Sequence, residues 1–440
     1  SAYTALLLRL VGVPRRGGWS SDDEGHRIIE SRWAQLFATS VFHQNRQFNS
    51  LNLVDVFRCS ADVEQHPQKL LINVEQEDRD YVARLLGEAT FTNTGPLVML
   101  QAGASQAKRQ WAPAKFIQLV KILTEQHNCR VVLTGTSKEL SIIEPIQAGT
   151  NSKNVFVAAG KTNIPQLTAM LEMSDILVTG DTGPMHISVA VGTPVVSMFL
   201  ASAFGFETGP YSEGNIVLQP IIGCGPCNPN KLCSRPDCHD CISPELIAEL
   251  TMMRLKEDFK TLPSGFQGAK DVHIYRSTFD QYGFCDLVPL VHHSDWHQKY
   301  REAYRKLWLE DLGGFPQGRS EAVPRNTFQI VDSALEGIND IAVLAEQGAR
   351  TIEELQRYIR DTTAPAALLG ATTDKLGELD RKIEEIGFYY PYLGPLSRMF
   401  LFAKENISGT DAGDLASQMG RNYSDLSTRA LALSQFYSTL

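Results

Sequence analysis

The feature that most constrains the fold is a regular alternation of short apolar segments and amphipathic segments between residues 96 and 199. The apolar segments are rich in β-branched side chains and are bounded by turn residues, which is typical of buried strands. They lie at 97–100, 130–134, 155–159, 175–179 and 194–199. Apolar strands that alternate with helices form parallel sheets covered on both faces. The region is therefore predicted to be a doubly wound α/β domain.

Helical spacing of apolar residues marks the segments between these strands. Phe116, Leu119, Val120 and Leu123 repeat at the interval expected for one helix face. The predicted helices span about 113–126, 138–148, 164–173 and 184–191. Residues 187–206 carry no charge, but Gly192, Pro194 and Gly205 interrupt them. A helix, a turn and a buried strand are therefore expected there rather than a membrane span.

The rest of the chain has a different character. A length of 440 residues predicts two or three domains. Residues 1–88 show few strand patterns, whereas residues 294–440 are mostly helical in pattern. We expect three segments, at 1–88, 89–265 and 266–440, of which only the middle one forms a complete α/β domain. The net charge of −9 argues against non-specific nucleic-acid binding, which needs a basic surface.

One motif at the end of a predicted strand points to a ligand. It consists of Asp181, Thr182, Gly183, Pro184, Met185 and His186. Ligands of open α/β sheets bind at the carboxyl ends of the strands. The unpaired N–H groups of a helix's first turn, together with the helix dipole, favour a diphosphate. A simple helix cap is the alternative, because Asp and Thr are common before helices.

Two other loops are predicted at the same edge of the sheet. The loop after 97–100 carries Gly103 and Ser105, followed by the cations Lys108 and Arg109. Two cations beside a helix end would complete a site for an anion, although a solvated surface loop is the alternative. The next loop carries Gly135 and Glu139, whose carboxylate could bind ribose hydroxyls or simply begin a helix. The loops contain neither the dinucleotide-binding nor the P-loop glycine pattern.

Taken in order, these motifs resemble the heptosyltransferase family of bacterial glycosyltransferases. The resemblance rests on Gly103, on Lys108 to Pro113, on the motif from Asp181 to His186, and on Gly192-Thr193-Pro194. It covers about residues 96–245. Members of this family build the inner core of lipopolysaccharide, so it implies an inverting, metal-independent transfer of heptose from an ADP-activated donor. It also implies two Rossmann halves, as in GT-B glycosyltransferases, of which the second binds the donor.

The resemblance also implies roles for individual residues. Thr182, Gly183 and Met185 would offer amides or side chains to the diphosphate. Asp181 would hold the sugar, Lys108 would neutralise phosphate, and Glu139 would face the ribose. His186 lies within the motif without an assigned role, and a helix-packing histidine is its alternative.

The same resemblance raises a question about the catalytic base. The family uses an Asp in a Gly-Asp motif near the amino terminus, and this motif is not found there in this sequence. We therefore expect residues 1–88 to be a remnant of the first Rossmann half, and the catalytic base stays unassigned. The alternatives are a non-catalytic nucleotide-sugar-binding or assembly protein, with the helical tail as an interaction module, and a nucleotide-sugar hydrolase or epimerase.

Five of the eight cysteines lie close together in the sequence. Cys224 and Cys227 form one C-x-x-C pair, and Cys238 and Cys241 form another, with Cys233 and His239 as alternate ligands. Two such pairs suit a tetrahedral structural zinc site. Free or partly paired thiols are the alternative. No catalytic metal is expected.

The resemblance finally implies partners and a place of action. The donor would be a nucleotide sugar, most simply ADP-heptose, and the acceptor a glycan or glycolipid. The chain would act in the cytoplasm, at the inner face of the bacterial inner membrane, with peripheral membrane association. The helical extension would be available to bind protein.

Overall fold

A computed structural model describes residues 2–12, 17–22, 25–63, 69–259, 269–293, 295–317, 335–361 and 363–440. The chain divides into two compact units. Unit 1 combines Ser1–Glu64 with Asp295–Leu440, and unit 2 is the continuous segment Gln65–Ser294. The grouping differs from the three segments expected from the sequence, because the two ends of the chain belong to the same unit.

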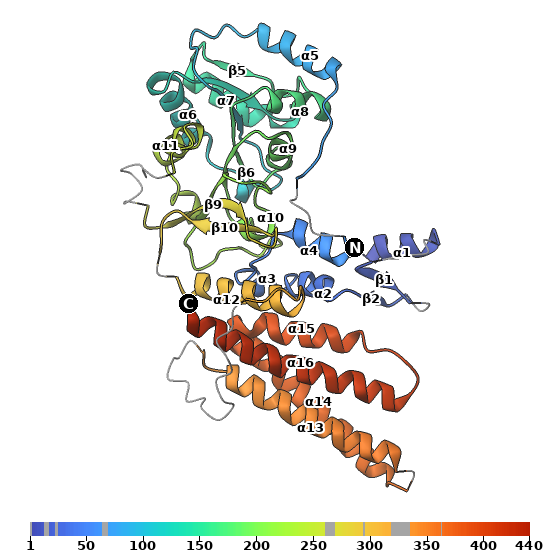
Figure 1. The fold of residues 1–440 in the computed structure, drawn as a ribbon. Helices are drawn as coiled ribbons and strands as arrows, with labels where there is room; N and C mark the ends of the chain where they lie inside the picture. Colours follow the sequence, from blue (N-terminus) through green and yellow to red (C-terminus); the bar gives the residue numbers. More distant parts are fainter. Residues whose placement is uncertain are drawn as a thin grey trace. The chain divides into compact units, whose positions relative to one another are not determined.

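Unit 2 contains an eight-stranded sheet with the order β10-β9-β8-β7-β6-β3-β4-β5. Its strands β5, β6, β9 and β10 are labelled in Figure 1. Six neighbouring strands are parallel, and β9 and β10 add an antiparallel edge. The strands are β3 (Leu97–Gln101), β4 (Arg130–Thr134), β5 (Val155–Val157), β6 (Ile176–Gly180), β7 (Val195–Met198), β8 (Ile216–Pro220), β9 (Val272–Phe279) and β10 (Cys285–Pro289). The predicted doubly wound α/β domain is confirmed.

Helices cover the two faces of this sheet because its strands are apolar on both sides. In β3, Val98 and Leu100 pack into one core, whereas Leu97 and Met99 pack into the other. The first core includes α6 (Pro113–Lys121), its π-helical continuation (Ile122–Gln126), α7 (Leu140–Thr150) and α11 (Pro244–Leu255). The second includes α5 (Gln76–Gly87), α8 (Ile164–Glu172) and α9 (Gly183–Val191).

The strand order places a topological switch point beside β3. The chain passes from β3 to β4 and β5 on one side, and then returns to β6 on the other side. The loops that follow β3, β4 and β6 therefore leave the same edge of the sheet. Crevices of this kind are where open α/β sheets bind ligands.

The uncharged segment at 187–206 folds as the sequence predicts. Helix α9 ends at Gly192, whose φ of +89° suits glycine, and β7 follows after Pro194. Across the described residues, the structure has no helix that is both long and apolar enough to cross a membrane.

The expected boundary at residue 265 falls within unit 2. β9 pairs with β8, and β10 pairs with β9, so the sheet continues to Pro289. These antiparallel edge strands show mixed polar and apolar residues, and sequence reasoning placed them in the helical extension. Their backbone pairing with β8, rather than their composition, assigns them to the α/β unit.

Unit 1 is mostly helical, as expected for its second segment. Its first segment contains α1 (Ala2–Leu10), α2 (Arg32–Thr39), α3 (His43–Arg46), α4 (Leu53–Ser60) and the hairpin β1–β2 (Trp19–Ser21 and Arg27–Ile29). Its second segment contains α12 (Trp296–Asp311), α13 (Ile338–Arg360), α14 (Ala366–Tyr389), α15 (Gly394–Glu405) and α16 (Ala412–Thr439). Leu376, Leu379, Ile383 and Ile386 form one stripe of α14, and the first three of them are buried.

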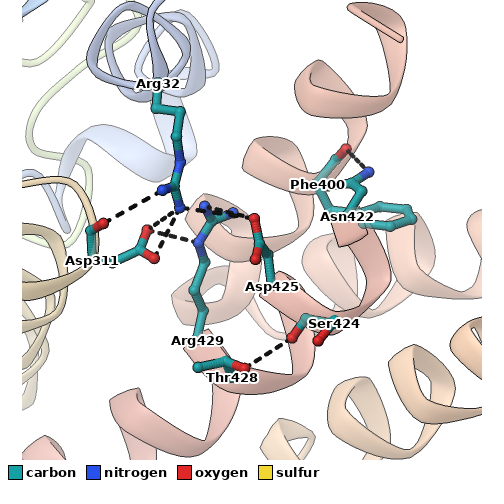
Figure 2. Close-up of polar contacts among 8 residues, drawn as sticks. All are labelled: Arg32, Asp311, Phe400, Asn422, Ser424, Asp425, Thr428 and Arg429. Carbon is teal, nitrogen blue, oxygen red and sulfur yellow. Dashed lines mark hydrogen bonds and ion pairs between the residues drawn. The ribbon is translucent and has the colours of Figure 1, made fainter. Parts of the chain in front are cut away.

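A network of charged side chains joins the two segments of unit 1 (Figure 2). Arg32 of α2 donates to both carboxylate oxygens of Asp311 at 2.9 Å. Arg429 of α16 donates to the same carboxylate at 2.9 Å, and its side chain is only 3% exposed. Asp425 lies 3.8 Å from both guanidinium groups. A single carboxylate thus links α2, α12 and α16.

Candidate functional site

The loops at the switch point enclose a cavity of about 580 Å³. Ten of the twelve residues predicted for a donor site line it. They are Gly103, Ser105, Arg109, Gly135, Glu139, Asp181, Thr182, Gly183, Pro184 and His186. The structure therefore brings together three loops that lie far apart in the sequence. Whether these residues bind a donor stays a prediction.

The first turn of α9 forms one wall of the cavity. Its N-cap residue, Thr182, makes no side-chain hydrogen bond to the helix, and Pro184 occupies the first turn. The Thr182 hydroxyl lies 2.8 Å from the hydroxyl of Thr179, which is buried at the end of β6. The positive end of this helix dipole is thus not covered by its own cap.

An ion pair lies beside this helix end. Arg109 donates from Nη1 to Asp181 Oδ2 at 3.1 Å, and from Nε to the hydroxyl of Ser202 at 2.9 Å. The two charged side chains are 20% and 12% exposed, so water screens this pair less than a surface pair. A guanidinium with further N–H groups, next to a helix N-terminus, is suited to an anionic ligand.

The glycine of the first loop allows Glu139 to approach closely. A Cβ atom on Gly103 would lie 1.5 Å from Glu139 Oε1. Glu139 accepts hydrogen bonds from Gln101 Nε2 at 3.1 Å and from the Thr136 backbone N–H at 2.6 Å. The Thr136 hydroxyl also donates to the Glu139 carboxylate. Thr136 and Glu139 together form a capping box at the start of the helix. Glu139 is therefore a helix-start carboxylate that also lines the cavity.

The remaining part of the cavity is more apolar and was missed from the sequence. Thr162, Asn163, Ile164 and Leu167 come from the start of α8, and Ile187 comes from α9. Ile164 is 66% exposed, so its side chain is accessible to a ligand in the cavity. The sequence analysis placed Ile164, Leu167 and Ile187 in predicted helices without a site role, and only the convergence of α8 with the switch point places these residues in a cavity.

His186 is the histidine of the motif, and burial lowers its pKa below the ordinary value, while the nearby Asp181 carboxylate opposes the shift. The imidazole is therefore expected to be neutral at pH 7. A neutral ring can donate or accept one hydrogen bond at the cavity wall.

Two predicted site residues, Lys108 and Met185, are not among the residues that line the cavity. The Lys108 ammonium donates to the carbonyl groups of Asn228, Pro229 and Lys231 at 2.9, 3.0 and 2.8 Å. In this structure these three carbonyl groups bind the Lys108 ammonium, and the expectation that Lys108 neutralises phosphate stays a prediction. The Met185 side chain is fully buried in the core beneath α9. Arg109, the neighbour of Lys108, is the cation that lines the cavity.

The thiols of both expected C-x-x-C pairs lie near each other, since Cys224 acts on the pKa of Cys227 and Cys238 acts on the pKa of Cys241. Burial raises the pKa of Cys227 to about 11, and the nearby Cys224, Cys238 and Cys233 add to the shift. Cys241 also donates to the Asp237 carbonyl at 3.6 Å. The alternate ligand His239 is buried, with its Nε2 2.8 Å from the Lys108 carbonyl.

No disulfide is formed by these cysteines. In the described part of the chain, no three His, Cys, Asp or Glu side chains are arranged to hold a metal ion. The structural zinc site stays a prediction. Metal analysis of protein purified without chelator would test it, and less than stoichiometric zinc would contradict it.

A comparison with known protein families identifies the family of this chain. A family model described as glycosyltransferase family 9 (heptosyltransferase) matches residues 1–236, which is more than half of the chain. The chain therefore belongs to glycosyltransferase family 9, and the resemblance inferred from its motifs is confirmed.

The similar curated proteins are heptosyltransferases. The chain is 32% identical over 118 residues to the lipopolysaccharide core heptosyltransferase OpsX of Haemophilus influenzae, with 26% of this chain and 33% of that protein covered. It is 34% identical over 122 residues to lipopolysaccharide heptosyltransferase 3 of Escherichia coli, covering 27% and 35%. A match to lipopolysaccharide heptosyltransferase 2 of Salmonella typhimurium has 25% identity over 228 residues and covers 51% and 64%. The chain thus spans about a third to two thirds of the length of these relatives.

A solved structure gives a weaker likeness. The family 9 glycosyl transferase of Veillonella parvula superposes with a TM-score of 0.39 and 22% identity, over 47% of this chain and 59% of that one.

Proposed function

We propose that this chain transfers a heptose from ADP-heptose to a glycan acceptor of the lipopolysaccharide-core type, with inversion at the anomeric carbon. The observation that carries the proposal is the cavity in which Arg109, the first turn of α9 and Asp181 meet. Membership of glycosyltransferase family 9 supports the reaction class. The motif residues and the cavity lie in the same continuous unit.

Different residues of the cavity would contact the diphosphate, the sugar and the nucleoside of such a donor. The diphosphate would lie against the guanidinium of Arg109 and the N-terminus of α9, since both favour negative charge. Asp181 would accept hydrogen bonds from the sugar hydroxyls, and Glu139 from the ribose. The adenine ring of the donor would contact the apolar side chains of Ile164 and Leu167, which line the same cavity.

The reaction would be a single displacement. The acceptor hydroxyl oxygen forms a bond to the anomeric carbon as the bond from that carbon to the diphosphate oxygen breaks. The electron pair leaves with the nucleoside diphosphate, and a base takes the hydroxyl proton. Arg109 and the helix end would stabilise the charge that develops on the leaving group. We expect the reaction to need no catalytic metal, so activity should survive EDTA.

We further propose that the chain acts in the cytoplasm, at the inner face of the inner membrane. A glycolipid acceptor would be presented there, and it would hold the enzyme at the membrane surface. The helices of unit 1 would then be available for contact with acceptor or with protein partners.

A transfer assay tests this function directly. ADP-heptose and a truncated lipopolysaccharide core would be incubated with the 440-residue chain and with its Asp181→Ala variant. Wild type should glycosylate the acceptor, and the variant should lose about 100-fold or more of this activity, because a charged contact to the sugar is removed. Asp80→Ala, at an exposed position of α5, is the matched control.

Two results would contradict the proposal. If wild type binds ADP-heptose but transfers nothing, the chain is a nucleotide-sugar-binding protein. If wild type consumes the donor without an acceptor, it is a hydrolase or an epimerase.

A further inference from the structure

A second cavity lies in unit 2, and it shares no lining residue with the cavity at the switch point. Its volume is about 510 Å³, which is within the usual range for small-molecule sites. One wall comes from the loop after β3, and the other comes from residues 229–239, which belong to the segment with the clustered cysteines. The donor contacts proposed above do not use this cavity.

One amide group at the wall of this second cavity lacks a partner. The Nε2 atom of Gln110 is buried and has no hydrogen-bond partner among the described residues. Buried polar groups of proteins are almost always hydrogen-bonded, because a buried donor without an acceptor is costly. An oxygen-rich ligand in the cavity would supply an acceptor for this group.

Further polar groups line the same cavity. Gln106 accepts a hydrogen bond from the Ser202 hydroxyl through Oε1 at 3.4 Å, which leaves its Nε2 group to donate to a ligand. Asn230 adds a third amide, and the exposed Lys231 adds an ammonium group. A side-chain amide can both donate and accept, which matches the hydroxyl groups of a sugar.

The rest of the lining suits the carbon skeleton of a sugar. Pro229, Leu232 and Pro236 present apolar surface, and Leu232 is fully exposed. Sites for small molecules commonly combine such surface with a few polar groups that fix orientation. The Lys231 ammonium would attract a carboxylate or phosphate on the same ligand. The lining therefore favours an acidic saccharide.

The two cavities are separated by one short turn of the chain. Ala107 of the 3-10 turn Ala107–Arg109 lines the second cavity, and Arg109 of the same turn lines the first. The Ser202 hydroxyl accepts from Arg109 Nε at 2.9 Å and donates to Gln106, so it contacts a wall of each cavity. A saccharide in the second cavity would thus lie beside the proposed donor site.

We propose that the second cavity is a subsite for the saccharide acceptor, and that Gln110 and Lys231 bind an acidic sugar of this acceptor there. The inference rests on the proposed function, because it assumes that the chain transfers a sugar to a glycan. Gln110 would donate from Nε2 to a sugar oxygen, and Lys231 would pair with the carboxylate or phosphate. Part of the acceptor would then be bound by the same unit that carries the donor cavity.

Steady-state transfer assays with varied concentrations of the truncated-core acceptor test the subsite. Gln110→Met keeps the length of the side chain but removes the amide, and Lys231→Met removes the charge. Each change should raise the acceptor KM about tenfold, because it removes a hydrogen bond or an ion pair to the acceptor. The KM for ADP-heptose should stay within about twofold. Gln147→Met and Lys153→Met, at exposed positions that line neither cavity, are the matched controls and should leave both KM values unchanged.

Thermal unfolding separates a binding role from a structural one. Because Gln110 Nε2 has no partner among the described residues, Gln110→Met should leave the melting temperature unchanged or raise it. A lowered melting temperature, together with equal increases in the KM values of acceptor and donor, would overturn the subsite. Such a result would indicate general disruption of the unit.

A direct titration identifies the charged group of the acceptor. Calorimetry would measure binding of the deacylated core oligosaccharide before and after enzymatic removal of its phosphate. Both Gln110→Met and Lys231→Met should bind the untreated oligosaccharide about tenfold more weakly than wild type does. Loss of wild-type binding after phosphate removal would assign the charge to phosphate, and retained binding would assign it to a carboxylate.

The outcomes separate this inference from the proposed function. Transfer by wild type, with an unchanged acceptor KM in both variants, would overturn the subsite alone. A wild type that transfers nothing would overturn the proposed function, and the oligosaccharide titration would then decide the subsite. Weaker binding by the variants would support it, whereas equal binding, or no binding by wild type, would overturn it.

Discussion

The two units of this chain are assembled in different ways. Unit 2 is a continuous segment in which the parallel strands and helices alternate along the sequence. Unit 1 joins residues from both ends of the chain, and its helices depend on contacts such as Arg32 with Asp311. The difference shows why local patterns predicted most of the strand and helix order of unit 2 but only the helical content of unit 1. The spacing of apolar residues indicates local secondary structure. The two segments of unit 1 are joined by contacts between residues that are far apart in the sequence, such as Arg32 and Asp311.

Asp311→Ala is expected to have the largest effect on stability, and it tests whether the two units are stabilised separately. The change removes the shared partner of Arg32 and Arg429 and leaves a buried guanidinium without its main carboxylate. It should destabilise unit 1 by about 3 kcal/mol. Hydrogen exchange should become faster in α2 and α16 but not in β3, β4 and β6.

The neighbouring acid in the same network provides the control. Asp425 is 51% exposed and lies 3.8 Å from both guanidinium groups, so Asp425→Ala should cost less than about 1 kcal/mol. Equal acceleration of exchange in both units after Asp311→Ala would contradict their independent assembly.

A smaller effect is expected in unit 2 from Gly103→Ala. The new Cβ would collide with Glu139 and displace its carboxylate from Gln101. The cost should be about 1–2 kcal/mol of unfolding free energy, and both adenosine and ADP should bind more weakly. Thermal unfolding and calorimetry would measure the two effects.

Gly180→Ala is the control at the same edge of the sheet, because its Cβ would lie 3.6 Å from the nearest atom, the Met198 carbonyl oxygen. If Gly103→Ala binds both ligands as wild type does, Glu139 is only a helix-start residue.

The smallest effect concerns the pH dependence of unit 2. Because burial lowers the pKa of His186, the unfolded chain takes up a proton on this residue at a higher pH than the folded chain does. Stability should therefore decline as the pH falls below the ordinary value of about 6.5. His186→Gln should remove this part of the decline in melting temperature between pH 7.5 and 5.5. Identical pH profiles for wild type and variant would show that His186 does not contribute.

Much of unit 2 could be predicted because its strands are apolar and short. The five predicted strands from β3 to β7 and the helices between them are present. The edge strands β9 and β10 could not be predicted in this way. β9 contains His273, Arg276 and Ser277 among its apolar residues. The pairing of β9 with β8 is a tertiary contact that no local pattern reports.

In the candidate site too, local sequence patterns do not show which distant residues a side chain contacts. The motif from Asp181 to His186 located the cavity, because a strand end followed by a helix start is a local signal. That Arg109 lines the cavity while Lys108 donates to Asn228 depends on loops that are distant in the sequence. A pair of adjacent cations can point to opposite partners, and sequence alone does not say which one faces the ligand.

The central claim is that the cavity in unit 2 is a nucleotide-diphosphate site built around Arg109. Its most direct test is the ratio of ADP affinity to adenosine affinity, measured by calorimetry for wild type and for Arg109→Ala. Wild type should prefer ADP, and the variant should lose about 10- to 100-fold in ADP affinity while adenosine affinity stays unchanged. A wild type that binds the two ligands equally, or a variant that keeps the full preference for ADP, would contradict the claim.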